Sequence, residues 1–243
     1  MKTQNVYHPY LIISILGLLL VAPADLQVWG WREGRFYRHV SFQSTYRKVI
    51  QGDLNDDGVP EHIQWDEKHS QLRIISSELT SSDGELVDWQ SPDTWEVKQA
   101  AFTDLNRDGK PEVTLLVWRD FAPWFIDRYI PSGGRINGFH NAQGKSCHII
   151  LIGWENGRIR EVWAGSAMVD PVLSFIPADI DADGFQELIT LEGRYAYANN
   201  GWALSAWKWE GFGFIIINRL AAPFQYLELI EDKEGTAFLL AQK

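Results

Sequence analysis

Apolar residues occur along this chain in short runs that end at glycines or at acidic turns. Residues 113–118 (VTLLVW) and 188–191 (LITL) are examples, and each follows an acidic turn. β-Branched, aliphatic and aromatic residues of this kind favour the pleated, half-buried surface of a sheet. The pattern predicts an all-β domain.

Aromatic-rich runs that meet at a glycine predict β-hairpins. One begins with Trp29 and Trp31, turns at Gly34 and continues with Phe36 or Tyr37. The same arrangement recurs as Trp207, Trp209, Gly211 and Phe214, in weaker form as Trp154, Gly157 and Ile159, and between the apolar runs on either side of Gly84.

A second repeated element is a short acidic loop. Residues 52–61 (GDLNDDGVPE), 103–112 (TDLNRDGKPE) and 178–187 (ADIDADGFQE) align without gaps. Each has a small residue followed by Asp, an aliphatic residue, a glycine and a closing Glu. We call residues 53–61 loop 1, residues 104–112 loop 2 and residues 179–187 loop 3, and we number their positions from one to nine.

Loops and hairpins recur together about every 50 residues, which is typical of propeller blades. A fourth, degenerate loop begins near Ile230 and is expected to bind no metal. An insertion of about 24 residues, roughly 119–146, lengthens one unit. The prediction is a four-unit, β-propeller-like domain with four strands per unit, closed by pairing of the N- and C-terminal strands. An incomplete arc that a second chain completes is the alternative.

The loops have the oxygen spacing of a calcium site. Ca²⁺ takes six to eight hard oxygen ligands, and alternate side chains of one loop can supply most of them. The glycine at position 6 predicts a turn with positive φ. The predicted ligands are Asp53, Asn55, Asp57, the Val59 carbonyl and Glu61 in loop 1; Asp104, Asn106, Asp108, the Lys110 carbonyl and Glu112 in loop 2; and Asp179, Asp181, Asp183, the Phe185 carbonyl and Glu187 in loop 3.

Two other structures could account for these loops. Clusters of Asp, Asn and Gly also form plain turns, but three such clusters in phase with a repeat favour about three Ca²⁺ sites. An EF-hand needs helices and a bidentate carboxylate at position 12. That position holds Gln64, Leu115 and Thr190 and the flanking runs are β-type, which argues against an EF-hand.

The three loops resemble those of the FG-GAP/VCBS repeat family, which includes the propeller of integrin α subunits. The resemblance covers residues 27–243 in repeat organisation and is specific only in the loops, since no Phe-Gly…Gly-Ala-Pro signature is visible. It implies that each loop joins the first two strands of a blade and that Ca²⁺ has a structural role there.

Charge and cysteine content limit the classes of binding partner and the possible disulfides. The formal net charge is −10, and eleven of the 32 acidic residues lie in the three loops. This balance argues against nucleic acid, whose phosphates would be repelled, and fits a cation binder. Cys147 is the one cysteine, so no disulfide forms within one chain, and its position in a predicted strand favours a buried, small apolar role.

The N-terminus predicts export. Residues 11–21 (LIISILGLLLV) are uniformly apolar and are followed by Ala-Pro-Ala at 22–24, an A-x-A cleavage pattern. Residues 1–24 are therefore a signal peptide or an uncleaved membrane anchor, and the domain begins at about residue 25. The expected location is secreted or extracytoplasmic, with contact to a membrane only through this segment.

The leading functional hypothesis is a non-enzymatic binding or adhesion module for a protein or glycan. Aromatic and arginine side chains concentrate binding energy at interfaces, and the insertion offers Trp124, Phe125, Arg128 and Tyr129. The rival is a polysaccharide-processing hydrolase or lyase, for which Asp127 with His140, or Asp170 with Glu192, are the candidate groups. A purely structural, anchored spacer is the third alternative.

Overall fold

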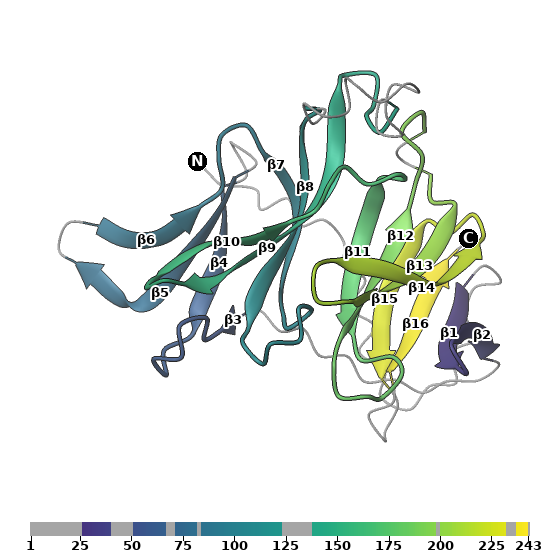
Figure 1. Ribbon diagram of the computed structural model, residues 1–243, viewed down its shortest axis with the longest axis horizontal. Helices are drawn as coiled ribbons and strands as arrows, with labels where there is room; N and C mark the ends of the chain where they lie inside the picture. The colour runs from purple at the N-terminus through teal and green to yellow at the C-terminus, as the bar shows by residue number, and fades with distance from the viewer. Residues whose placement is uncertain are drawn as a thin grey trace, which may run out of the picture.

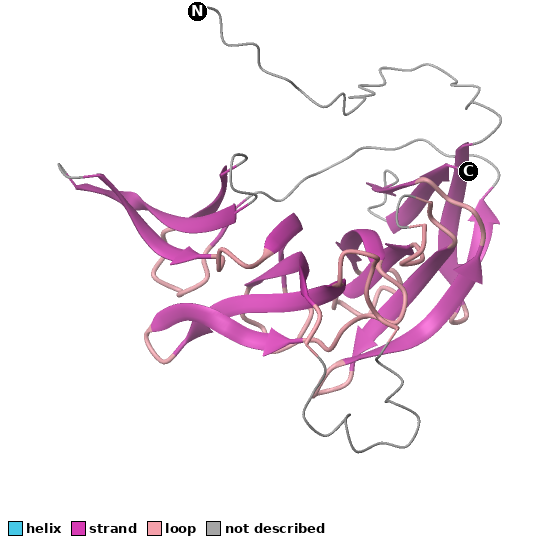
Figure 2. Cartoon of the chain, turned by 90° about the horizontal axis from the view of Figure 1, so that it is seen from above, coloured by secondary structure: helices cyan, strands magenta, loops and turns pink. Residues whose placement is uncertain are grey.

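The structure is a computed structural model that describes residues 26–39, 51–66, 71–81, 84–122, 138–197, 200–231 and 237–242. Within these ranges the regular secondary structure consists of strands, as Figure 2 shows, which confirms the all-β prediction. No helix in the described part is long and apolar enough to cross a membrane. Residues 1–25, and with them the predicted export segment, lie outside the described residues.

The described strands form four antiparallel sheets of four strands each. Sheet I contains β3 (Gln51–Gly52), β4 (Glu61–Asp66), β5 (Gln71–Ser81) and β6 (Gly84–Gln90). Sheet II contains β7 (Glu96–Thr103), β8 (Glu112–Asp120), β9 (Lys145–Glu155) and β10 (Arg158–Ala164). Sheet III contains β11 (Val172–Ala178), β12 (Glu187–Glu192), β13 (Ala203–Trp209) and β14 (Phe214–Ala221). The predicted four-strand unit is confirmed.

Sheet IV joins the two ends of the chain. Its order is β15 (Tyr226–Glu231), β16 (Ala237–Gln242), β1 (Leu26–Arg32) and β2 (Arg35–His39). β1 runs antiparallel to β16, with Leu26 opposite Gln242 and Trp29 opposite Leu239. The predicted pairing of the terminal strands is therefore confirmed.

The four sheets follow one another in a curved row (Figure 1). β5 and β6 contact sheet II, β11 contacts both β7 and β15, and β14 contacts β2. Sheets I and IV lie at opposite ends of the row, and their described strands make at most marginal contact with each other. A closed ring is therefore not seen in the described strands. One physical reason is that β3, the first strand of sheet I, has only two residues with which to meet a neighbour.

Three buried clusters fill the three interfaces of this row, one at each junction. The cluster between sheets I and II includes Leu72, Ile74, Val113 and Ile150. The cluster between sheets II and III includes Leu116, Cys147, Phe175 and Leu188, and the one between sheets III and IV includes Ile189, Leu204, Phe224 and Leu227. The predicted buried role of Cys147 is confirmed, since its side chain is fully buried.

Strands in the middle of the row do not alternate between apolar and polar residues. In β8 and β12 nearly every residue is buried, because a neighbouring sheet packs on each face. The aromatic hairpins lie nearer the edges. Trp31 pairs across the turn with Phe36 at 5.0 Å between ring centroids, and Trp209 pairs with Phe214 at 5.2 Å, both edge to face.

Gly201 provides a stability test of the junction between sheets III and IV. A Cβ at this position would lie 1.8 Å from the backbone oxygen of Phe224. The side chain of Phe224 is fully buried, and its ring packs on Trp29. Because the clash is with backbone, we expect Gly201→Ala to lower the free energy of unfolding by about 3 kcal/mol, the upper end of the usual overpacking range. Urea unfolding measures it. The control is Gly138→Ala, where the added methyl meets open space; equal stabilities of the two variants would contradict the packing described.

Candidate functional site

The three acidic loops occupy equivalent places, joining β3 to β4, β7 to β8 and β11 to β12. The glycine at position 6 has φ of 85°, 78° and 87° in loops 1, 2 and 3, as predicted. Position 4 also has positive φ, at Asp56 (60°), Arg107 (61°) and Ala182 (60°). This second left-handed residue could not be predicted from the sequence pattern, because its side chain differs in all three loops.

Each loop is closed from inside by the glutamate at position 9. Glu61, Glu112 and Glu187 are all buried. In each, one carboxylate oxygen accepts the backbone N–H of the position-2 residue, at 2.6 Å from Leu54, 2.7 Å from Leu105 and 3.2 Å from Ile180. The side chains of Leu54, Leu105 and Ile180 pack into the clusters between sheets I and II, II and III, and III and IV respectively.

The other acidic positions turn toward the loop centre. In loop 1, Asp53 accepts the N–H of Gly58 at 2.8 Å, and Asp57 accepts that of Val59 at 2.8 Å. The same bonds recur in loop 3, from Gly184 to Asp179 and from Phe185 to Asp183, and in loop 2 from Lys110 to Asp108. The side chains thus follow the backbone turn rather than splaying outward.

Loops 1 and 2 each hold buried oxygens without a partner. The second carboxylate oxygen of Glu61, that of Glu112 and one oxygen of Asp104 are buried and accept no hydrogen bond from any described residue. Burial raises the pKa of Glu61, and it raises the pKa of Glu112 to about 7. Buried acceptors normally have a donor or a cation, so these atoms fit a site for a hard cation.

Loop 3 brings its carboxylates closest together. Oxygens of Asp179, Asp181 and Glu187 lie within 4.8 Å of one another and could hold a metal ion. Here two cationic side chains also reach the loop, Arg107 from loop 2 and Lys208 from β13.

Two carboxyl groups of loop 3, those of Glu187 and Asp183, differ widely in pKa. Burial raises the pKa of Glu187 to about 7 and also opposes ionisation of Asp183. For Asp183 the hydrogen bonds from Lys208 and Phe185 and the charge of Arg107 outweigh burial and lower the pKa to about 2.

The fourth, degenerate loop lies where it was expected, between β15 and β16, although residues 232–236 are outside the described part. The predicted partner-binding residues Trp124, Phe125, Arg128 and Tyr129, and Asp127 of one candidate catalytic pair, also lie outside it. The other pair, Asp170 and Glu192, is described: both carboxylates bind the same guanidinium, that of Arg219. A single guanidinium thus links the two carboxylates.

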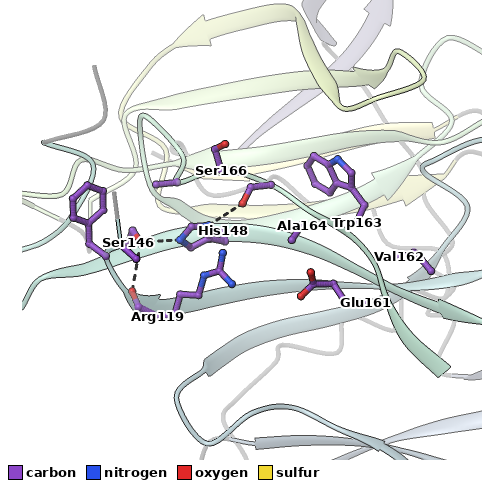
Figure 3. Close-up of a pocket in the computed structure, with 12 residues that line it drawn as sticks. Arg119, Ser146, His148, Glu161, Val162, Trp163, Ala164 and Ser166 are labelled. Carbon is purple, nitrogen blue, oxygen red and sulfur yellow. Dashed lines mark hydrogen bonds between the residues drawn. The ribbon is translucent and has the colours of Figure 1, made fainter. Parts of the chain in front are cut away.

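A pocket of about 410 Å³ lies beside β9 and β10, near the base of the insertion (Figure 3). Arg119, His148, Glu161 and Trp163 line it. His148 Nδ1 lies 2.9 Å from the Gly165 carbonyl, so this nitrogen carries the proton and Nε2 accepts from Ser146 Oγ at 2.7 Å. The sequence analysis missed this pair, although Ser146 and His148 stand two apart on a predicted strand and so share a face.

The Ser146–His148 pair resembles an activated nucleophile in its bonding but not in its access. Ser146 is fully buried and His148 is 6% exposed, and Ser146 Oγ also lies 3.5 Å from the Arg119 carbonyl. A nucleophile must reach its substrate. The pair is therefore a buried polar link between neighbouring strands.

Comparison with known proteins adds no relative: no protein-family model and no curated protein matches this chain. The likeness to the FG-GAP/VCBS repeat family rests on the loop residues and on the repeat organisation of the sequence.

The buried imidazole predicts a pH dependence of stability. Burial, helped by the charge of Arg119, lowers the pKa of His148 from 6.5 to about 4 despite its bond to Gly165. The folded chain therefore stays unprotonated there while the unfolded chain takes up a proton below pH 6.5. We expect stability to be lost as pH falls from 6.5 to 4, by about 3 kcal/mol in total.

Urea unfolding of the wild type and of His148→Gln at several pH values isolates this contribution as the difference between their slopes. His140→Gln, at a turn outside the pocket lining, is the matched control. If wild type and His148→Gln lost stability equally between pH 6.5 and 4, the conclusion that folded His148 is buried and neutral would be wrong.

Proposed function

We propose that this chain is an exported, non-enzymatic binding module whose β-sheets are held together by Ca²⁺ in the acidic loops. The observation that carries the proposal is the unpartnered, buried carboxylate oxygen at position 9 in loops 1 and 2. Glu61 and Glu112 keep one oxygen on the loop backbone and leave the other for a cation. Asp104 of loop 2 leaves a further buried oxygen.

The donor chemistry favours Ca²⁺ over other metals. Each loop offers carboxylate and amide oxygens, which are hard ligands. Softer metals prefer thiolate and imidazole, and the nine-residue loops contain neither Cys nor His. Mg²⁺ demands a near-ideal octahedron and keeps several waters, whereas Ca²⁺ accepts flexible geometry of the kind a single loop provides.

A structural role follows from where the loops lie. The aliphatic residue next to the first Asp of each loop is buried in the interface with the following sheet. Fixing the loop therefore fixes a contact between two sheets. At millimolar Ca²⁺, a site with a Kd of about 0.1–1 mM adds ~0.4–1.4 kcal/mol to the folded state.

We further infer that the four sheets are blades of a propeller-like arrangement of the FG-GAP/VCBS kind. The recurring four-strand unit, the shared loop position and the shared terminal sheet support this. A closed ring would need one further junction. Sheets I and IV would either pack on each other or be joined through a second chain. A rigid set of sheets that presents loops suits recognition of a protein or glycan.

The rival function, a polysaccharide-processing enzyme, needs an accessible acid and base. Of its candidate groups in the described part, Asp170 and Glu192 share Arg219. The Ser146–His148 pair, which only the structure brings to notice, is buried. A screen for hydrolysis or elimination on a panel of glycans separates the two functions. Turnover that is lost on replacing Asp170 or Glu192 would favour the enzyme.

Calcium removal is the direct test of the structural role. With two sites occupied at millimolar Ca²⁺, we expect about 2 kcal/mol of added stability, a rise in melting temperature of roughly 4–8 °C over the chelated protein. Calorimetric unfolding with Ca²⁺, with Mg²⁺ and with chelator measures it, and Mg²⁺ should act more weakly. An equal melting temperature under all three conditions would contradict a structural role for a metal ion.

Single glutamate substitutions test the sites one at a time. Glu61→Gln and Glu112→Gln keep an oxygen for the backbone N–H of position 2 but remove the charge, so each should abolish one Ca²⁺ site in isothermal titration calorimetry. Glu210→Gln, on an exposed turn, is the matched control. Unchanged stoichiometry in both loop variants would show that these carboxylates do not bind the ion.

A further inference from the structure

Arg107 belongs to loop 2 by sequence but to loop 3 by contact. It stands at position 4 of loop 2 with a left-handed φ of 61°, and its side chain contacts residues of loop 3. Its guanidinium lies 5.1 Å from the centroid of the Phe185 ring in loop 3. The side chain is only 16% exposed, which is low for an arginine at a surface turn.

The guanidinium binds the carboxylates that loop 3 would offer to a metal. Nη1 lies 3.2 Å from Asp183, and Nη2 donates to Glu187 Oε1. That second oxygen of Glu187 is the counterpart of the unpartnered oxygens of Glu61 and Glu112. Lys208 adds a second positive charge, 2.8 Å from Asp183 and 3.4 Å from Asp181.

Loops 1 and 2 have no such charge. Among the residues that the structure describes, no lysine or arginine lies within ion-pair distance of Asp53, Asp57 or Glu61, or of Asp104, Asp108 or Glu112. The three loops share one acidic pattern, but among the described residues only loop 3 receives cationic side chains from outside its own segment.

We propose that Arg107 is a built-in cation of loop 3, which takes the place that Ca²⁺ takes in loops 1 and 2 and makes loop 3 a metal-independent fastening between sheets II and III. This rests on the proposed function of loops 1 and 2. A guanidinium and a Ca²⁺ ion cannot both occupy Glu187 Oε1, since like charges at that distance repel. The chain therefore binds two Ca²⁺ ions, and loop 3 takes one only when Arg107 leaves.

The arrangement also gives loop 3 a different function from its counterparts. A metal in loop 1 or 2 ties together one loop, whereas Arg107 ties loop 2 to loop 3 across two sheets. A second bond crosses at the same place, from the backbone N–H of Asp104 to Gln186 at 3.0 Å. This junction persists without metal because both of its bonds come from the chain itself.

Calcium titration of the full chain tests the proposal. Wild type should bind two ions, and Glu187→Gln should leave that number unchanged, whereas Glu61→Gln and Glu112→Gln should each lower it to one. Arg107→Gln, which removes the charge but keeps amide donors, should raise the number to three. Arg158→Gln, on the exposed start of β10, is the matched control. Isothermal titration calorimetry gives the stoichiometry, and circular dichroism confirms folding of each variant.

The outcomes separate this inference from the proposed function. Three ions in wild type, falling to two in Glu187→Gln, overturns the inference and leaves calcium binding intact. Two ions in both wild type and folded Arg107→Gln also overturns it. If wild type binds none and Arg107→Gln binds one, the inference stands while calcium binding by loops 1 and 2 fails. If Arg107→Gln does not fold, the unchanged count in Glu187→Gln decides.

Discussion

The hydrogen bond that a buried glutamate accepts from the backbone N–H seven residues before it sets the geometry of the acidic loops. Glu61, Glu112 and Glu187 each make it. The bond fixes the position-2 residue, whose side chain then enters the interface with the next sheet. Removing a carboxylate from water is costly unless its remaining lone pairs are matched. The buried glutamate at position 9 of each loop would therefore be stabilised by a positive charge close to its second oxygen.

That charge can be supplied in two ways, and this chain uses its own cations for one of the three loops. In loop 3 the guanidinium of Arg107 and the ammonium of Lys208 supply the charge. In loops 1 and 2 the corresponding oxygens have no described partner. Position 4 of loop 2 decides the difference for loop 3. Of the three residues at position 4, which are Asp56, Arg107 and Ala182, Arg107 is the one that carries a positive charge, and it reaches Glu187.

Local patterns predicted what depends on local sequence. The strand runs, the hairpin glycines, the placement of loops 1 to 3 between paired strands and the pairing of the chain ends all followed from spacing. Contacts between units did not. Arg107 aligns with Asp56 and Ala182 and gives no sign of its target, which depends on how sheet II packs on sheet III. Ser146 and His148 were separable from an ordinary strand only once the Gly165 carbonyl was known to face the imidazole.

The degenerate fourth loop and the open row have a common explanation. Loops 1, 2 and 3 each lock a sheet to its successor, through Leu54, Leu105 and Ile180. A fourth loop would lock sheet IV to sheet I, the one junction at which the described strands make at most marginal contact. At that place the sequence has Ile230 instead of the first Asp and Phe238 instead of the closing Glu, so it lacks the buried carboxylate. Among the described strands, the junction whose loop lacks the glutamate is thus also the one with at most marginal contact, as expected if the glutamate at position 9 holds each loop against the next sheet.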